Sequence, residues 1–201
     1  MTDTTPVRAS DRLEQGDRLR GERRWLPMLA VLAVMAVATL GGFVVAAALS
    51  KPAGPPVGFP GLVQVQPLSG WEPASSGFLD GRAFVRLTRG SGTLLVLDWG
   101  ASPSDPRILA RSVVDEALTT SFAQVTVSQR LSSVVLADGT PGARFTFVGT
   151  DAESGGSVEG EITAAVGLSD RAVVFVGLAP EGLLAFVDGD LHTMVAQAEV
   201  G

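Results

Sequence analysis

LADGTPGARFTFVG, residues 136–149, and VEGEITAAVG, residues 158–167, are the two segments whose pattern defines the architecture of this chain. In the first segment Phe145 and Phe147 alternate with polar residues, and in the second apolar residues alternate with glutamate and threonine. A period of two predicts β-strands that have one buried and one solvated face. We therefore expect two adjacent antiparallel strands, with the glutamates on the solvated face.

The same alternation predicts the register of this strand pair. Phe145 must align with an apolar residue such as Ile162 for the two buried faces to match. Arg144 then shares the opposite face with Glu159 and Glu161. We predict that Arg144 and Glu161 are cross-strand neighbours.

Similar stretches recur on both sides of this pair, separated by Gly-rich or Asp-Gly turns. They predict further antiparallel strands at residues 84–88, 93–99, 125–136 and 172–178. Two segments have helical spacing instead, one from Asp105 to Phe122 and one from about Glu181 to Ala198. The predicted class over residues 62–201 is α+β, an antiparallel sheet with helices packed on it.

The longest apolar run, residues 25–49, carries no charged side chain. About 20 residues at 1.5 Å rise cross a hydrocarbon core of roughly 30 Å, so this run predicts one transmembrane helix. Four arginines precede it closely and only Lys51 follows, which places the N-terminus in the cytoplasm. We expect residues 1–24 to be a disordered tail and the Pro- and Gly-rich residues 50–61 to link the span to an extracytoplasmic domain at the plasma membrane.

Two further interpretations of this run stay open. Ala46 to Ala48 match a signal-peptidase site, so cleavage after Ala48 is an alternative to a retained anchor, although the run is longer than a typical signal. A stripe of small residues at four-residue spacing could also pack a second copy of the helix in a homodimer. The stripe consists of Ala38, Gly42, Ala46 and Ser50.

The composition of the 201-residue chain disfavours several chemistries. The absence of Cys excludes disulfides, thiolate metal sites and a cysteine nucleophile. No phosphate-binding glycine motif occurs. Residues 51–201 carry 9 basic and 16 acidic side chains, a balance of −7, so nucleic acid is not an expected partner. The strong preference for Arg over Lys is typical of a GC-rich genome and suggests an actinobacterial source.

Few residues remain as candidates for catalysis or metal binding. Glu159 and Glu161 could act as a carboxylate pair, as in glycoside hydrolysis, but alternating glutamates are also ordinary on a solvated strand face. His192 is expected to be a solvated helix residue. Asp188 and Asp190 lack the remaining spacing of a calcium loop. No catalytic, cofactor-binding or metal-binding residue is therefore assigned, and the protein is not expected to be an enzyme.

Three arginines and one tryptophan each allow a functional and a structural interpretation. Arg82, Arg86 and Arg89 could form a basic patch that contacts acidic partners, although a solvated strand face is the favoured explanation. Trp99 ends an apolar strand, where it could line a pocket or pack in the core. Core packing is the favoured interpretation of Trp99.

The order of these elements resembles the Mog1/PsbP-like family. The segments that carry the resemblance, beside the strand pair quoted above, are Gly70-Trp71, DPRILARSVVDEAL at 105–118, RAVVFVGLA at 171–179 and LLAFVDGDLHTMVAQ at 183–197. The resemblance covers residues 62–201 and implies an α/β/α sandwich. Because members of this family mostly bind or assist other proteins, it also implies a non-catalytic role, and it supplies no catalytic set to transfer.

Together these features predict a single-pass membrane protein with an extracytoplasmic binding or accessory module that engages a protein partner at the cell envelope. Two other functions stay open. The first is an envelope hydrolase that uses Glu159 and Glu161, which requires a cleft around these carboxylates. The second is a carrier of a lipophilic ligand, which requires an apolar cavity between the sheet and a helix.

Overall fold

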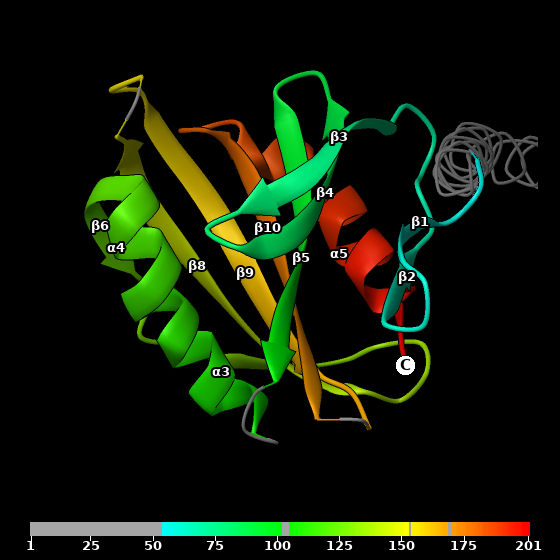
Figure 1. Ribbon diagram of the computed structural model, residues 1–201. Helices are drawn as coiled ribbons and strands as arrows, with labels where there is room; N and C mark the ends of the chain where they lie inside the picture. The colour runs from blue at the N-terminus through cyan, green and yellow to red at the C-terminus, as the bar shows by residue number, and fades with distance from the viewer. Residues whose placement is uncertain (1–53, 102–104, 153, 169) are drawn as a thin grey trace, which may run out of the picture. The chain divides into compact units, whose positions relative to one another are not determined.

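A computed structural model of the protein describes residues 54–101, 105–152, 154–168 and 170–201 (Figure 1). These residues belong to one compact unit, Ser50–Gly201. The expected tail at 1–24, the expected span at 25–49, its small-residue stripe and the possible cleavage point after Ala48 lie outside the described residues. Within the described ranges, no helix is long and apolar enough to cross a membrane.

The largest part of the fold is one eight-stranded antiparallel sheet. Its strands are β3 (Glu72–Leu79), β4 (Arg82–Arg89), β5 (Gly92–Ala101), β6 (Phe122–Val127), β7 (Ser132–Val135), β8 (Pro141–Asp151), β9 (Ser157–Val166) and β10 (Arg171–Pro180). Their order is β3-β4-β5-β10-β9-β8-β6, and β7 also pairs with β8. The predicted strands at 84–88, 93–99 and 172–178 are thus confirmed, each with longer ends, and the segments 136–149 and 158–167 contain the predicted strand pair as β8 and β9.

A second, three-stranded antiparallel sheet joins the beginning and the end of this unit. Its strands are β1 (Val57–Phe59), β2 (Val63–Val65) and β11 (Glu199–Val200). Since β1 lies inside residues 50–61, the ordered domain starts earlier than the expected linker allowed.

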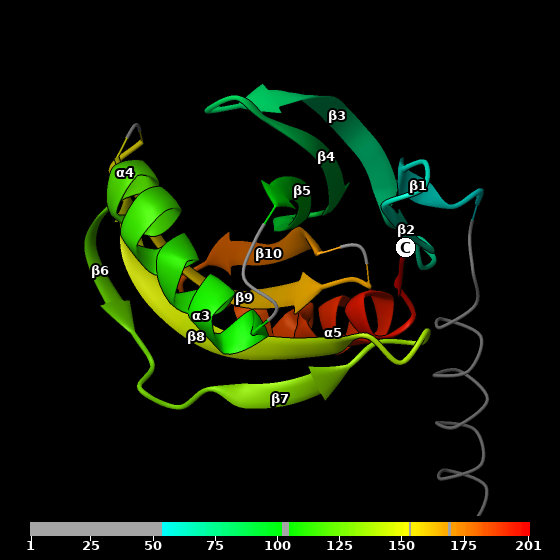
Figure 2. The same ribbon diagram turned by 60° about the horizontal axis from the view of Figure 1, so that its bottom comes forward.

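Helices cover both faces of the large sheet (Figure 2). One side carries a continuous helical segment made of α3 (Pro106–Val113), a π-helical turn η1 (Val114–Leu118) and α4 (Thr119–Ser121). The other side carries the 3-10 turn η2 (Leu184–Phe186) and α5 (Asp188–Ala196). This arrangement confirms the antiparallel sheet with helices packed on it.

The first helical segment begins where the sequence predicts it. The Asp105 side chain accepts a hydrogen bond from the Arg107 backbone N–H at 2.8 Å, and Pro106 occupies the first turn. The helix widens at η1, where the Thr119 N–H donates to the carbonyl of Val114, five residues earlier. Such π-turns are rare and often occur at functional sites.

Each face of the sheet has its own buried core because side chains alternate along every strand. On β10, Val173 and Phe175 belong to the core under α5, whereas Val174 and Val176 belong to the core under α3. Phe145 pairs with Ile162 between β8 and β9, as the alternation predicts. Both residues are buried on the α3 side.

One predicted strand is divided into two strands in the structure. The segment 125–136 forms two strands, β6 and β7, which both pair with β8. Between the pairs Val127 to Phe147 and Ser132 to Arg144, this segment has four residues where β8 has two. The surplus residues cannot follow the ladder, so the strand is interrupted.

Candidate functional site

An apolar cavity of about 180 Å³ lies between the large sheet and the α3–η1–α4 segment. We call it the sheet–helix pocket. Its walls come from β3, β5, β9, β10, the helical segment and the start of β6. They consist of Leu79, Leu95, Leu97, Trp99, Val113, Ala117, Leu118, Ser121, Phe122, Ile162, Val174, Val176 and Leu178. Two side chains in this lining carry a polar group, the hydroxyl of Ser121 and the indole N–H of Trp99.

Strand and helix periodicity bring these residues together. Residues 95, 97 and 99 of β5 point to one face, as do residues 174, 176 and 178 of β10. Residues 113, 117 and 121 follow one stripe of the helical segment. The pocket is therefore the part of the α3-side core that the helix does not fill.

The pocket approaches the surface at the tip of the β3–β4 hairpin. Leu79 lines the pocket and is still 43% exposed, and its neighbour Phe78 is 78% exposed. The turn between the strands, Asp80-Gly81, has positive φ at both positions, 49° and 79°. This is the geometry of a tight hairpin turn that favours Asp-Gly, so the tip is a defined feature of the fold.

A single arginine lies at this rim of the pocket. The Arg82 guanidinium carbon lies 3.8 Å from the ring centroid of Trp99, in a cation–π arrangement. Nη2 of Arg82 also donates a hydrogen bond to Glu116 of η1 at 2.7 Å. The ion pair thus connects the β3–β4 hairpin to the π-turn beside Ala117. Trp99 is half-buried, lines the pocket and packs against the α3-side core, so the structure supports both interpretations of this residue.

The three arginines considered as a possible basic patch, Arg82, Arg86 and Arg89, lie in different surroundings. Arg89 binds the carboxylate of Asp190, in the first turn of α5, which also accepts a hydrogen bond from the indole N–H of Trp71 at 2.9 Å. Trp71 is buried in the core on the α5 side. Arg86 is exposed. Arg89 and Asp190 therefore have a structural role, in which they hold α5 to the sheet edge.

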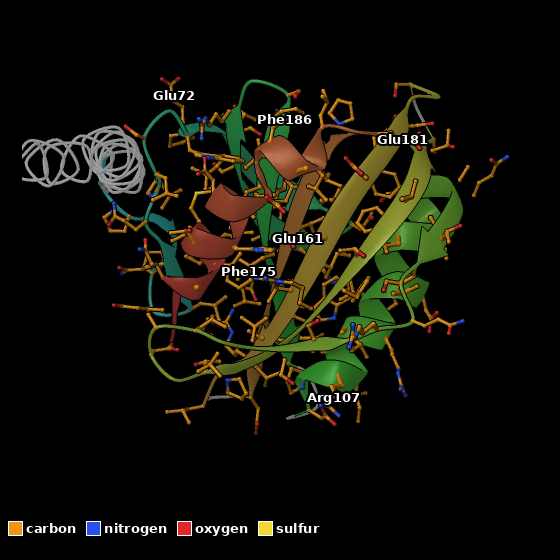
Figure 3. All side chains as sticks on the ribbon, turned by 180° about the vertical axis from the view of Figure 1, so that it is seen from behind. Glu72, Arg107, Glu161, Phe175, Glu181 and Phe186 are labelled. Carbon is orange, nitrogen blue, oxygen red and sulfur yellow. The ribbon has the colours of Figure 1, made fainter. Side chains whose placement is uncertain are left out.

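Glu161 of β9 lies on the other face of the sheet, beneath α5 (Figure 3), where it belongs to a charged cluster. Arg144 of β8 and Glu161 of β9 share this face, with Nε and Oε2 3.8 Å apart, so their predicted proximity is confirmed. The Arg144 Nε–H also donates to Thr163 Oγ1 at 3.0 Å. Nε2 of His192, on α5, lies 2.6 Å from Oε2 of Glu161. The prediction of a solvated face is wrong for Glu161, which is only 4% exposed, because α5 covers it.

The second glutamate of the candidate pair is also occupied by a protein group. Oε1 of Glu159 accepts a hydrogen bond from the backbone N–H of Leu184, at the start of η2, at 2.6 Å. Glu159 and Glu161 thus share a face but bind different parts of the η2–α5 segment. Their contacts fasten this segment to β9.

Metal binding finds no further support in the part of the chain that the structure describes. No three His, Asp or Glu side chains there are grouped closely enough to hold a metal ion. Asp188 and Asp190 lie in the first turn of α5, where carboxylates interact favourably with the helix dipole. This position accounts for both residues without a calcium ligand role.

Comparison with known proteins gives similarity in structure alone. No family model and no curated protein sequence matches the chain. The Ran-binding protein Mog1p of Saccharomyces cerevisiae has a TM-score of 0.48 and 13% identity, over 75% of this chain and 96% of that one. PsbP of the cyanobacterium Synechocystis has a TM-score of 0.49 and 12% identity, over 76% and 99%. A mutant of Mog1 has a TM-score of 0.46 and 15% identity, over 72% and 94%. These are proteins of the family that the sequence resembles, and the similarity concerns the fold.

Proposed function

We propose that the folded domain is a non-catalytic binding module of the cell envelope, and that it takes an apolar group into the sheet–helix pocket. The observation that supports this function is the pocket itself, an apolar space between the sheet and a helix that reaches the surface at Leu79. A lipophilic ligand carrier requires such a space. This function joins the expected binding role to the expected carrier of a lipophilic ligand.

The size of the pocket limits what it can hold. Its volume of about 180 Å³ is similar to that of an engineered apolar cavity of roughly 150 Å³ that binds benzene in another protein. One ring or part of one alkyl chain fits such a space, but a complete two-chain lipid does not. The bound group is therefore one tail or one side chain of a larger ligand or partner.

The test fills the pocket from its helical wall. Ala117 lines the pocket, so Ala117→Phe places a ring in the space that the ligand would occupy. Full-length protein in lipid nanodiscs is labelled with decanol that carries a photoreactive diazirine at its chain end. We expect Ala117→Phe to reduce labelling of the α3–η1–α4 peptides about tenfold. Ala196→Phe, at an exposed position on the opposite side of the sheet, adds the same ring and should leave labelling unchanged.

Equal labelling of these peptides in wild-type protein and Ala117→Phe would contradict the proposal. Thermal unfolding of both variants shows whether a loss of labelling reflects a filled pocket or an unfolded domain. An unfolded Ala117→Phe variant is replaced by Ala117→Leu, which adds a smaller side chain at the same position.

The membrane part of the proposal rests on residues 25–49 and their flanking charges. A protease added to intact cells should then cleave the chain in the folded domain, after residue 51, and leave the N-terminal tail protected. Cleavage only after cell lysis would contradict this topology. The arrangement as a homodimer through Ala38, Gly42 and Ala46 remains a prediction of the sequence.

A further inference from the structure

The charges and apolar side chains around the pocket mouth identify the chemistry of the ligand more closely. We infer that the sheet–helix pocket holds the tail of a single-chain anionic amphiphile, that Arg82 binds its head group, and that the tail enters from a lipid bilayer beside the β3–β4 tip. This inference rests on the proposed function, since it requires the pocket to bind an apolar group.

Arg82 is the charged donor placed to meet a head group at this mouth. Its guanidinium lies against Trp99, a pocket residue, and its strand position pairs directly with Leu79, the exposed pocket residue. A guanidinium has five N–H donors in a planar fork that matches carboxylate or phosphate oxygens. The structure records one of these donors, Nη2, in a bond to Glu116.

The present partner of Arg82 can be replaced by a ligand at small cost. The side chains of Arg82 and Glu116 are 27% and 51% exposed, so their ion pair is largely solvated. Exposed ion pairs contribute little to stability. An anionic head group whose tail is buried in the pocket is held beside Arg82 at a high effective concentration, and it can therefore displace Glu116. Stacking on Trp99 would keep the guanidinium in place during this exchange.

The net negative charge of the domain makes Arg82 important for the selection of an anionic ligand. Residues 51–201 carry a balance of −7, from 9 basic and 16 acidic side chains, so the domain as a whole repels anions. A preference for an anionic ligand must then come from a local contact at the mouth of the pocket. Arg82 is the basic residue with contacts to the pocket rim there.

The hairpin tip supplies the contact with the bilayer. Phe78 is 78% exposed beside Leu79, which is 43% exposed and continues into the pocket. Large apolar side chains exposed at one hairpin tip are informative, since an exposed apolar patch marks a candidate binding surface. An exposed phenylalanine close to an arginine also suits the surface of a membrane, where apolar side chains insert at the boundary between head groups and acyl chains and basic side chains meet anionic head groups. The expected span at 25–49 would keep the domain close to such a surface.

The experiment compares three head groups on one tail. Full-length protein in nanodiscs is labelled with diazirine-tagged decanoate, decanol or decylamine, and labelled peptides of α3–η1–α4 are quantified. We expect decanoate to label these peptides about tenfold more efficiently than decanol, and decylamine least, because a charged hydrogen bond at the mouth favours the anion. Arg82→Gln should reduce decanoate labelling to the level of decanol and leave decanol labelling unchanged.

Two variants control for charge and for competition. Arg107→Gln removes the same charge from an exposed position on α3, away from the pocket lining, and should leave the preference for decanoate intact. Glu116→Gln removes the anion that competes for Arg82, so it should increase decanoate labelling severalfold. Equal labelling by decanoate and decanol in wild-type protein, or an equal effect of Arg82→Gln and Arg107→Gln, would overturn the inference while the pocket function stands. Absence of pocket labelling by all three probes would instead overturn the proposed function.

A second experiment tests whether the ligand enters from the bilayer or from solution, with the same diazirine tag on two probes. One probe is free decanoate in solution, and the other is a single-chain anionic lysophospholipid incorporated into the nanodisc. Phe78→Ser should reduce labelling by the bilayer probe severalfold and leave labelling by free decanoate unchanged. Val135→Ser, at a residue of β7 that is 66% exposed, is the matched control. Equal effects of the two substitutions on the bilayer probe would show that the ligand does not enter from the bilayer at this tip.

Discussion

At the scale of single residues, the burial of Glu161 shows how this domain uses its few charged side chains. A carboxylate that is removed from water needs opposite charges or hydrogen-bond donors. Glu161 has Arg144 and His192 as partners, from β8 and α5. Its contacts explain its position between sheet and helix without any catalytic role.

We predict a large loss of stability when this carboxylate is removed. Glu161→Met leaves Arg144, whose side chain is only 16% exposed, without its anion. Breaking a buried pair in this way should lower the free energy of unfolding by about 3 kcal/mol. His192→Ala should lower it by less than about 1 kcal/mol, because the His192 side chain is 44% exposed. Urea unfolding of the two variants measures the difference, and equal stability of Glu161→Met and wild-type protein would contradict the structural role.

The sequence predicted the position of Glu161 but not its burial. The alternation on β8 and β9 is local, and it correctly placed Arg144 and Glu161 on one face. The residue that covers them, His192, is 31 positions further along the chain. Periodicity within a strand contains no information on which helix packs over it, so the solvated face was the wrong inference. The same limit applies to the sheet–helix pocket, whose lining comes from elements between residues 79 and 178.

At the scale of elements, the close approach of α5 to β10 depends on one glycine. A Cβ atom at Gly177 would lie 2.7 Å from Cδ1 of Leu191 and 3.3 Å from Cγ of Glu161. Leu191 is fully buried in the core under α5. A side chain at position 177 would therefore require Leu191, or the helix that carries it, to shift.

Gly177→Ala should force α5 away from the sheet and lower the free energy of unfolding by about 2 kcal/mol. Leu191→Ala should by itself cost about 3 kcal/mol, through loss of buried apolar contact. In the double variant the shortened side chain at 191 makes room for the new methyl group. The two effects should therefore be less than additive, by about 1 kcal/mol in a double-mutant cycle measured by urea unfolding. Strict additivity would show that the contact between Gly177 and Leu191 does not limit the helix position.

The strands differ in how well their sequences predict them. β8, β9 and β10 consist of uninterrupted apolar or alternating residues, and the sequence predicts all three. β3, EPASSGFL, contains Pro73 and Gly77 and no apolar alternation, so nothing in its own sequence indicates a strand. It forms because β4 offers a free edge, and the Asp80-Gly81 turn folds β3 back onto it. The missed strand carries the exposed tip of the proposed ligand entrance.

At the scale of the whole domain, the C-terminus is fixed by a residue from a distant turn. The Asp138 carboxylate, in the β7–β8 turn, accepts hydrogen bonds from the backbone N–H groups of Thr140 and Val200. Val200 belongs to β11, which pairs with β2 near the start of the domain. One carboxylate thus links the large sheet to the small sheet that joins both ends of the domain. Sequence patterns predicted Gly-rich or Asp-Gly turns between the strands, but they could not identify the partner of Asp138, which lies 62 positions later.

This link predicts a pH-dependent stability of the domain. Partial burial alone would raise the pKa of Asp138, but the N–H groups of Thr140 and Val200 bind the charged form and hold the pKa below its usual value of 3.8. A lowered pKa in the folded state stabilises the fold above the pKa of the unfolded chain, and this contribution disappears as the pH falls through the folded value. Asp138→Asn should therefore be less stable than wild-type protein at neutral pH, and the difference should vanish in acid below 3.8.

Urea unfolding over a series of pH values tests this expectation directly. Asp170→Asn is the matched control, because Asp170 is an exposed turn residue with a positive φ of 56° that asparagine also tolerates. Its difference from wild-type protein should stay small and constant across the series. If the difference between Asp138→Asn and wild-type protein also stayed constant into acid, the charge of Asp138 would not stabilise the link between the sheets. The position of β11 would then depend on other contacts, which include its pairing with β2, the burial of Val200 and the hydrogen bond from the Gly201 N–H to the Leu62 carbonyl.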